Sequence, residues 1–436
     1  MQNRTPDLAA LYNRYRAASA VSTDSRQPQD GTLFFALNGP SFRGRDFAPQ
    51  ALAKGARHAV VDDEALAAQD PEHYTFAPDP LVALQELAHY HRRQLIIPVL
   101  AITGSNGKTT TKELVYTVLS RRYKVQYTRG NLNNHIGVPL TLLSIRPGEH
   151  ELAIVEMGAN HQGEIELLCR LAEPTHGLIT NIGKAHLEGF GGVEGIVKGK
   201  GELFRFLEQV GGLAFVNTLD ARLPGMATTV AERITYPGPT DSYPAELISA
   251  APQVVLRLFE GTVVEAQITG GYNFPNLAAA AAVGAYFKVE PAAIAEALAS
   301  YAPTNNRSQL VRTAYNELVL DAYNANPSSM TAALNSFAAR PGNPADKVVI
   351  LGDMFELGPD SEAEHRVIGQ LLSSLPFGTV LLVGPDMRHA ALDPSFRHFA
   401  TKPEAAAWLQ AHPLRNRQLL IKGSRGMGLE TLVELV

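Results

Sequence analysis

The chain has 436 residues, too many for one ordinary hydrophobic core, so we expect two to four domains. Its 45% hydrophobic and 19% charged residues are typical of a soluble globular protein, and its net charge of -5 argues against nonspecific binding to nucleic acid or anionic membrane. No apolar run approaches the roughly 20 residues of a membrane span.

The N-terminal sequence and the cysteine content indicate a cytoplasmic protein. MQNRTPDLAALYNRYRAA predicts a polar amphipathic helix and lacks the apolar stretch of a signal peptide. The single cysteine, Cys169, excludes an internal disulfide and a cysteine-based zinc site. It lies in the apolar helical pattern IELLCRLA, which predicts a buried structural thiol.

Residues 1–97 predict a first α/β segment. The short strand-like runs TLFFAL, HAVVDD and HYTFA alternate with polar turns and are followed by the helical pattern LVALQELAHYHRRQL. Ser25 lies in STDSRQPQDGTLFFALNG, which by itself indicates only a turn that leads into a strand.

The second segment, residues 98–309, opens with a predicted phosphate-binding loop. The apolar strand IIPVLAIT leads into Gly-Ser-Asn-Gly-Lys-Thr and then into a helix from Lys108. Gly104 and Gly107 let successive backbone N–H groups face one way, Lys108 adds a cation, and Thr109 offers a hydroxyl to Mg²⁺. The glycine of the generic pattern is replaced by Ile102, so this is the short form of an ATP phosphate loop.

The rest of this segment alternates strands and helices. YKVQYT, a helix at 137–143, ELAIVEMG, a helix at 163–172 and HGLITNI predict a doubly wound, mostly parallel sheet with ligands at the carboxyl ends of its strands. VVLRLFE and TVVEAQIT, within about 213–271, suggest an antiparallel edge. A strong helix former, NLAAAAAVGAYF, follows, with Asn273 and Asn276 at its start.

Residues 310–436 predict a separate Rossmann-like domain. Its order is ELVLDAYNA, a helix from Pro327, KVVILGDM, a helix around 361–374, TVLLVG, a helix near 404–411, QLLIKGS and a last helix, GLETLVELV.

Chemistry-bearing side chains follow several of these strands. Glu156 ends ELAIVE, where an open α/β sheet places Mg²⁺ ligands, although a solvated acid is an equal reading. His186 follows LITNI, in a loop position where a lone histidine is more often an ordinary polar residue. The other candidates are individually weak, and their shared position at strand ends is what indicates a site: Lys198, Lys200, Arg307, Asp321, Tyr323, Asn324, Lys422, Ser424 and Arg425.

Nine motifs occur in the order seen in the Mur ligases, the ATP-dependent amide ligases of peptidoglycan precursor synthesis. They are TGSNGKTT, TRGNLNNHIGVPLTLL, EMGANHQGEI, NIGKAHLEGFGG, KGKGELF, GYNFPNLAAA, YNANPSSM, LGDMFELG and KGSR. The chain resembles this family from about residue 22 to 428. GNLNN, GANH and AHLEGFG resemble the branch that adds D-alanyl-D-alanine, and STDSR…GTLFFAL is similar to the uridine-nucleotide domain.

The resemblance implies three α/β domains: residues 1–97 binding the UDP-sugar, a P-loop ATPase domain at 98–309, and a Rossmann-like domain at 310–436 binding the dipeptide. It implies UDP-MurNAc-tripeptide, D-alanyl-D-alanine and ATP as substrates, with Mg²⁺ as cofactor. ATP phosphorylates the peptide carboxylate, and the dipeptide amine attacks the acyl phosphate. A role in cell wall biogenesis, cell shape and division follows, and we expect a monomer.

The resemblance also implies roles for the catalytic and metal-binding positions. Lys108 and the loop N–H groups would hold the β- and γ-phosphates, and the loop set is Gly104, Ser105, Asn106, Gly107, Lys108, Thr109 and Thr110. Thr109 and Glu156 would hold one Mg²⁺. His186 would bind a second, helped by Lys200 as a CO₂ carbamate, since a carbamate is an anionic oxygen ligand. Lys198 is the rival, but Lys200 directly precedes Gly-Glu-Leu-Phe.

The remaining roles concern nucleotide and substrate. Asn273 and Asn276 resemble adenine contacts, Arg307 a phosphate clamp, and Asp321 with Tyr323 the ribose and phosphate edge. The residues expected to face UDP-MurNAc are Ser25, Asn133, Asn134 and His135. Those expected to take the dipeptide carboxylate are Lys422, Ser424 and Arg425.

The chain departs from the family pattern at three places. Tyr272 stands where a histidine is usual before Asn273, the family's Asp-Asp-Ser-Tyr reads Leu-Asp-Ala-Tyr at 320–323, and Arg45 replaces a common histidine. Two alternatives stay open. A sister amide ligase, such as a folylpolyglutamate synthase or an earlier Mur ligase, would lack GNLNN and GANH. A P-loop ATPase switch would hydrolyse ATP without an amine acceptor.

Overall fold

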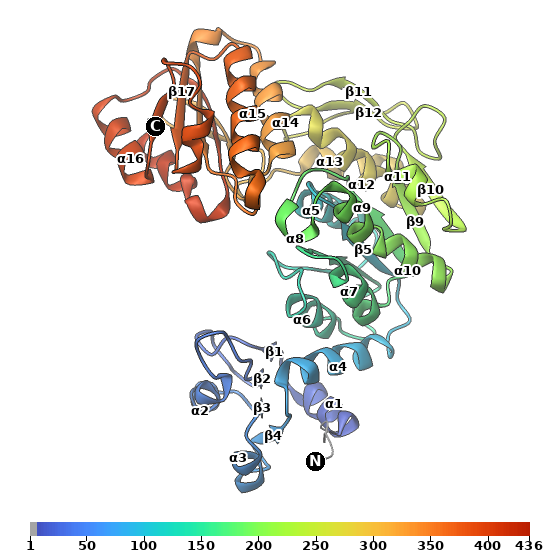
Figure 1. Cartoon of the computed structure of the whole chain (residues 1–436). Helices are drawn as coiled ribbons and strands as arrows, with labels where there is room; N and C mark the ends of the chain where they lie inside the picture. The colour runs from blue at the N-terminus through green and yellow to red at the C-terminus, as the bar shows by residue number, and fades with distance from the viewer. Residues whose placement is uncertain (1–6) are drawn as a thin grey trace. The chain divides into compact units, whose positions relative to one another are not determined.

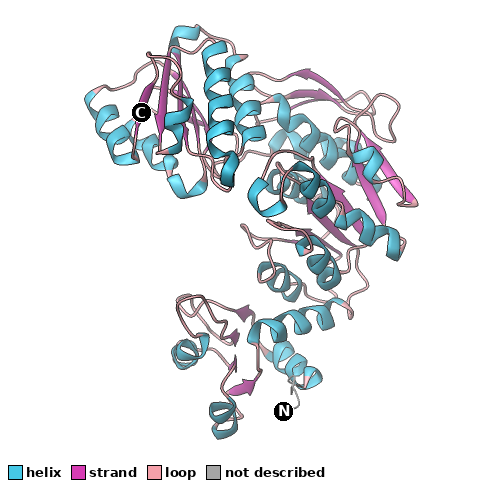
Figure 2. Cartoon of the chain, in the orientation of Figure 1, coloured by secondary structure: helices cyan, strands magenta, loops and turns pink. Residues whose placement is uncertain are grey.

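A computed structural model describes residues 7–436 of the chain. Its contacts group into two compact units. The first comprises Met1–Ile102, Tyr123–Gly158 and Gly163–Gly177, and the second comprises Thr103–Arg122, Ala159–Gln162 and Leu178–Val436. Figure 1 labels the elements along the chain, and Figure 2 colours them by type. Within residues 7–436, no helix is long and apolar enough to cross a membrane.

The N-terminal segment forms a small parallel sheet with helices. Its four strands lie in the order β1-β2-β3-β4. The predicted runs are confirmed because their apolar residues, such as Phe34 and Val61, are buried. The first predicted helix begins at Leu8, and the part of that prediction on residues 1–6 lies outside the described residues. The elements are α1 (Leu8–Ala17), β1 (Val21–Ser22), β2 (Leu33–Phe35), η1 (Gly44–Phe47), α2 (Ala48–Ala53), β3 (His58–Val61), α3 (Glu64–Gln69), β4 (Tyr74–Phe76) and α4 (Pro80–Arg92).

The central sheet has six strands in the order β10-β9-β8-β5-β7-β6. The pairs β5–β7, β6–β7 and β9–β10 are parallel, which confirms the doubly wound α/β prediction. Strands β5, β7 and β9 are buried along their whole length, as expected when helices cover both faces of a sheet. The strands are β5 (Val99–Thr103), β6 (Val125–Tyr127), β7 (Leu152–Glu156), β8 (His176–Ile179), β9 (Leu213–Asn217) and β10 (Glu232–Tyr236).

The helices of this region include three that the sequence did not resolve, α8 to α10. They follow β8 and carry the NIGKAHLEGFGG and KGKGELF motifs. The helices are α5 (Lys108–Leu119), α6 (Gly137–Leu143), α7 (Glu164–Ala172), α8 (Leu187–Phe190), α9 (Val193–Lys200), α10 (Glu202–Val210), α11 (Leu223–Met226), η2 (Gly271–Asn273), α12 (Phe274–Tyr286) and α13 (Pro291–Ser300).

The strand-like runs near 254–269 pair antiparallel, but they do not form an edge of the parallel sheet as expected. They belong to a separate three-stranded sheet in the order β11-β12-β13. The middle residues of β12 and β13, Leu256 and Val264, are buried, whereas the residues on either side of them are exposed or half-buried. Only one face of this small sheet is therefore buried, so its strands do not suit the parallel sheet, which is buried on both faces. The strands are β11 (Glu246–Ser249), β12 (Val255–Arg257) and β13 (Val263–Glu265).

The C-terminal sheet has the order β14-β15-β19-β16-β17-β18, with β14 antiparallel and the other pairs parallel. Figure 1 shows α14 and α15 on one side of it and α16 on the other. The elements are β14 (Gln309–Arg312), β15 (Glu317–Asp321), α14 (Pro327–Ala338), η3 (Pro344–Asp346), β16 (Lys347–Gly352), η4 (Gly358–Asp360), α15 (Ser361–Ser374), β17 (Thr379–Val383), η5 (Asp386–Ala390), β18 (Arg397–Phe399), α16 (Lys402–Ala411), β19 (Gln418–Lys422) and η6 (Arg425–Met427).

The last predicted helix is a 3₁₀ helix, η7 (Leu429–Leu435), and not an α-helix. Leu429, Leu432 and Leu435 recur every three residues and pack on the C-terminal core. A three-residue repeat matches the 3₁₀ period, in which positions i and i+3 eclipse.

Candidate nucleotide-binding site

The predicted phosphate loop has the expected strand–turn–helix conformation. Gly104 (φ +140°) and Gly107 (φ +79°) have positive φ, and α5 begins at Lys108. A Cβ on Gly104 would lie 2.0 Å from Thr180 Oγ1, so only glycine fits there. Lys108 Nζ donates to the carbonyl oxygen of Gly104 at 2.7 Å, which holds the cation against the loop. The loop therefore presents a cation and a helix N-terminus at one place.

The segment after β8 fixes the loop from one side. The backbone N–H of Ser105 donates to the Asn181 carbonyl oxygen, and that of Asn106 to Asn181 Oδ1, both at 3.0 Å. Ser105 Oγ exchanges hydrogen bonds with the backbone of Gly183, both at 2.9 Å. Two of the N–H groups expected to hold phosphate are thus bonded to Asn181. The candidate N–H donors to phosphate are therefore those at later positions of the loop. Thr109 and Thr110 lie in the first turn of α5 and are buried.

The two asparagines expected to contact adenine form a buried chain with α5. Thr111 Oγ1 donates to Asn276 Oδ1 (3.1 Å), and Asn276 Nδ2 donates to Asn273 Oδ1 (3.0 Å). Asn273 Nδ2 in turn donates to the carbonyl oxygen of Thr269 at 2.8 Å. Asn273 precedes α12 but its side chain does not cap that helix. Both amides therefore hold the start of α12 to the helix of the phosphate loop.

In the first unit, Glu156 lies buried at the end of β7 and meets a predicted substrate residue. Asn133 Nδ2 donates to Glu156 Oε1 at 2.8 Å, and the Glu156 N–H donates to Thr128 Oγ1 at 3.0 Å. Asn134 instead has a local role, since its Oδ1 accepts from the N–H of Gly137 at the start of α6 (2.9 Å). Within the motif GNLNN, Asn133 thus contacts Glu156 and Asn134 contacts the start of α6.

The two other predicted substrate residues of this unit make ordinary contacts. Ser25 is buried, and its Oγ donates to Gln50 Oε1 at 3.3 Å. The carbonyl oxygen of His135 accepts from Gln85 Nε2 at 3.0 Å.

Lys200 is buried, whereas the rival Lys198 is exposed. Lys200 Nζ donates to the Ala159 carbonyl oxygen at 3.2 Å and lies 5.0 Å from the centre of the Phe190 ring. Burying a charged ammonium group excludes water from it, and the surrounding polar groups must offset that loss of solvation.

His186 has positive φ (+54°) just before α8, and its Nδ1 forms an ion pair with the carboxylate of Glu356. The hydrogen bond from His186 lowers the pKa of Glu356. Nearby, Lys184 pairs with Glu364, and the Lys184 N–H donates to Ser328 Oγ at 2.9 Å. The sequence reasoning missed both glutamates, although Glu356 lies within the LGDMFELG motif.

The residues predicted to bind metal include two oxygen donors, Thr109 and Glu156. Within residues 7–436, no three His, Cys, Asp or Glu side chains are grouped as a metal site. A threonine hydroxyl and one carboxylate still suit Mg²⁺, which keeps several waters and takes phosphate oxygens as ligands. Thr109 and Glu156 fit such a cation in chemistry, and His186 is engaged by Glu356 in this structure.

At the C-terminal sheet, Asp321 and Lys422 are register partners on β15 and β19. Lys422 is buried, and its Nζ lies 2.6 Å from Asp321 Oδ2. Ser424 is also buried, and its Oγ accepts from the N–H of Phe355 at 2.9 Å. Of the three residues expected to take the dipeptide carboxylate, Arg425 is the exposed one.

Two arginines meet the ring of Tyr323. The guanidinium carbon of Arg307 lies 3.7 Å from the ring centre and that of Arg425 lies 5.0 Å from it. Arg425 Nη1 also donates to the Tyr323 hydroxyl at 3.1 Å. The structure thus brings together a predicted phosphate clamp, a predicted ribose-edge residue and a predicted carboxylate-binding residue.

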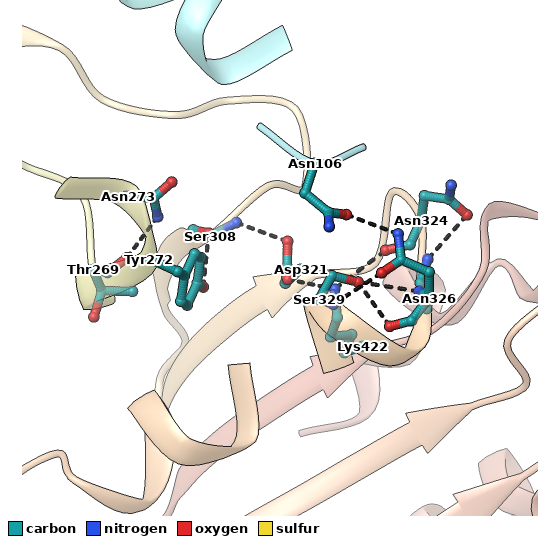
Figure 3. Close-up of polar contacts among 11 residues, drawn as sticks. Asn106, Thr269, Tyr272, Asn273, Ser308, Asp321, Asn324, Asn326, Ser329 and Lys422 are labelled. Atoms are coloured by element: carbon teal, nitrogen blue, oxygen red, sulfur yellow. Dashed lines mark hydrogen bonds and ion pairs between the residues drawn. The ribbon is translucent and has the colours of Figure 1, made fainter. Parts of the chain in front are cut away.

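The phosphate loop also contacts the start of α14. Asn326 Nδ2 donates to Asn106 Oδ1 at 2.7 Å, as Figure 3 shows. Asn326 caps α14 and forms a capping box with Ser329. Sequence reasoning did not single out Asn326, although it lies in the YNANP motif.

Comparison with known proteins places three domain families along the chain. The Mur ligase family catalytic domain matches residues 18–95, the Mur ligase middle domain 102–284, and the Mur ligase glutamate ligase domain 306–425. The chain is 37% identical over 427 residues to UDP-N-acetylmuramoyl-tripeptide–D-alanyl-D-alanine ligase of Escherichia coli, covering 95% of this chain and 92% of that protein. It is 35% identical over 428 residues to the enzyme of that name from Bacillus subtilis, with the same coverage.

A solved structure extends this similarity to the whole fold. A crystal structure of MurF from Acinetobacter baumannii superposes with a TM-score of 0.86 at 32% identity, covering 99% of this chain and 98% of the other. The three matched segments follow one another as three α/β domains.

Proposed function

This chain belongs to the Mur ligase family, and on that premise we propose that it is the ligase that joins D-alanyl-D-alanine to UDP-N-acetylmuramoyl-tripeptide, with cleavage of ATP to ADP and phosphate. The observation that carries the proposal is the nearly full-length similarity to relatives of that name. The product, UDP-MurNAc-pentapeptide, serves peptidoglycan precursor synthesis and cell wall biogenesis.

In the first step, an oxygen of the tripeptide's terminal carboxylate attacks the γ-phosphorus of ATP, ADP leaves, and an acyl phosphate forms. The protein's task is to position the reactants and to neutralise charge, as in other phosphoryl transfers. Lys108 and the N-terminus of α5 would stabilise the negative charge that builds on the phosphate oxygens. Mg²⁺, when bound, would shield those oxygens, with Thr109 and Glu156 as its protein ligands.

In the second step, the dipeptide amine attacks the acyl carbon, and the tetrahedral intermediate collapses to the amide and phosphate as the nitrogen loses a proton. Arg425 would bind the dipeptide carboxylate, because its side chain is exposed, whereas Lys422 and Ser424 are buried. Lys422 would act through Asp321, which its ammonium group orients.

We also propose that Lys200 carries a carbamate. The neutral amine of Lys200 would add to the carbon of CO₂ and release a proton, and the resulting carbamate would offer an anionic oxygen ligand for a second Mg²⁺, together with His186. His186 is paired with Glu356 here, so this role requires that pair to open.

The division at 1–97, 98–309 and 310–436, the monomeric state, the cytoplasmic location and roles in cell shape and division stay predictions. The three family matches support the order of the domains. Domain 1–97 would bind the UDP-sugar through Ser25, and residues 133–135 would face the same substrate.

The test is ATP-dependent phosphate release with UDP-MurNAc-tripeptide, with and without D-alanyl-D-alanine, followed by mass spectrometry of the product. Release that needs both substrates and gives the pentapeptide supports the proposal. Release that ignores the dipeptide would overturn it and favour a sister ligase or an ATPase switch.

A further inference from the structure

Tyr272 is a partly buried residue of the nucleotide region to which the reaction described above gives no role. It lies directly before Asn273, in η2. Its ring packs against Gly270, where a Cβ would lie 2.5 Å from Tyr272 Cε1. Gly270 has φ +91°, so this close approach of ring and backbone depends on glycine. The backbone two residues before Tyr272 therefore helps to fix the position of its ring.

The Tyr272 hydroxyl reaches the segment that joins α13 to β14. It forms a hydrogen bond with Ser308 Oγ at 2.9 Å, as Figure 3 shows. Burial raises the pKa of the Tyr272 hydroxyl, which keeps it protonated and able to donate. Ser308 is itself buried.

Ser308 has an unfavourable backbone conformation. Its φ is +49°, in the left-handed region that residues other than glycine rarely adopt. In this conformation its N–H donates to Asp321 Oδ1 at 3.1 Å. The other carboxylate oxygen of Asp321 is held by Lys422. Asp321 is thus fixed at both oxygens, and one of the two contacts depends on the strained backbone of Ser308.

We propose that Tyr272 is a positioning residue for the nucleotide: its hydroxyl holds Ser308 in the left-handed conformation, and Ser308 then orients the carboxylate of Asp321. This inference rests on the proposed function, because it takes Asp321 as a nucleotide contact. Tyr272 also links the Ser308–Asp321 pair to the phosphate loop, since the neighbouring Asn273 is bonded through Asn276 to α5.

The first experiment measures the Kd of ADP by calorimetry, and the KM of all three substrates, for Tyr272→Phe. Loss of one hydrogen bond that orients a charged group corresponds to about a five- to tenfold rise in the ADP Kd and the KM of ATP. We expect the KM of the UDP-substrate to stay unchanged. The control is Tyr236→Phe, which removes the hydroxyl of another buried tyrosine, at the end of β10.

Two substitutions of Ser308 separate positioning from general stability. Ser308→Ala removes the Oγ and keeps the strain, so it should match Tyr272→Phe, and the double variant should be no worse. Ser308→Gly adopts positive φ without strain, so ADP binding should stay within about twofold of wild type, even together with Tyr272→Phe.

An unchanged ADP Kd in Tyr272→Phe would overturn the inference, as would an equal rise in all three KM values or additive effects of the two substitutions. The ADP measurement needs no ligase activity. If the wild-type chain fails to make pentapeptide, the proposed function fails, while the ADP Kd values still decide the role of Tyr272.

Discussion

Replacing Gly107 by alanine tests how the phosphate loop depends on its surroundings. Gly107 has φ +79°, and the left-handed conformation costs an alanine about 1–2 kcal/mol. The added Cβ would lie 2.7 Å from Asn276 Oδ1 and 3.2 Å from its Cγ, which is closer than van der Waals contact. Asn276 is buried and bonded to Thr111 and Asn273, so it cannot move away without breaking those bonds.

The structure gives a magnitude for this substitution. Breaking two hydrogen bonds at about 1 kcal/mol each adds roughly 2 kcal/mol to the backbone term, so Gly107→Ala should destabilise the fold by about 3–4 kcal/mol. If the loop shifts instead, it loses one charge-assisted contact to phosphate, and nucleotide binding should weaken about 10- to 100-fold.

The matched control is Gly211→Ala. Gly211 has a similar φ of +66° after α10, but a Cβ there would meet nothing within 4 Å. It should therefore show only the backbone cost of about 1–2 kcal/mol and bind nucleotide normally. The assay is thermal unfolding of both variants, with ADP affinity by calorimetry. Equal melting temperatures, together with unchanged ADP affinity in Gly107→Ala, would refute the reasoning.

Three further predictions concern other sites. Lys200→Arg keeps a cation but cannot form the carbamate, so phosphate release should fall at least about 100-fold, and a wild-type rate would contradict the carbamate. Glu113 accepts hydrogen bonds from Tyr301 and Asn305. Glu113→Gln should lower the free energy of unfolding by about 1–2 kcal/mol in denaturant, because the charged acceptor is lost, and an unchanged midpoint would oppose this. Burial first, and then Arg14, lower the pKa of His58 from 6.5 to about 4, so the folded state favours the neutral ring. The contribution of His58 to folding stability is complete above pH 6.5 and is lost as pH falls toward about 4. His58→Gln should therefore weaken the pH dependence of the melting temperature over that range, and an unaltered pH dependence would count against this interpretation.

Local sequence patterns determined the elements of this protein. Runs such as VLAIT and KVVILG predicted buried strands, and these strands are buried throughout. Gly104 and Gly107 predicted a tight turn, and both have positive φ. These predictions succeeded because hydrophobic periodicity and the freedom of glycine act within a few residues of chain. The last predicted helix is present as a 3₁₀ helix, whose period matches the three-residue spacing of its leucines.

The partners of the polar side chains were decided by the tertiary structure. Asn276 stays a predicted adenine contact, and in the structure its side-chain amide is bonded to Thr111 and Asn273. Lys422 stays a predicted dipeptide contact, and in the structure it is buried and its ammonium group contacts Asp321. Glu356 was not expected at the site, yet it pairs with His186.

The physical reason is the distance along the chain between the bonding groups. Thr111 and Asn276 are 165 positions apart, and Asp321 and Lys422 are 101 apart. A hydrogen bond depends on position and angle at the scale of tenths of an ångström, which only the packed elements fix. The sequence by itself therefore predicted which residues carry the chemistry, and the fold decided which of them are paired with one another.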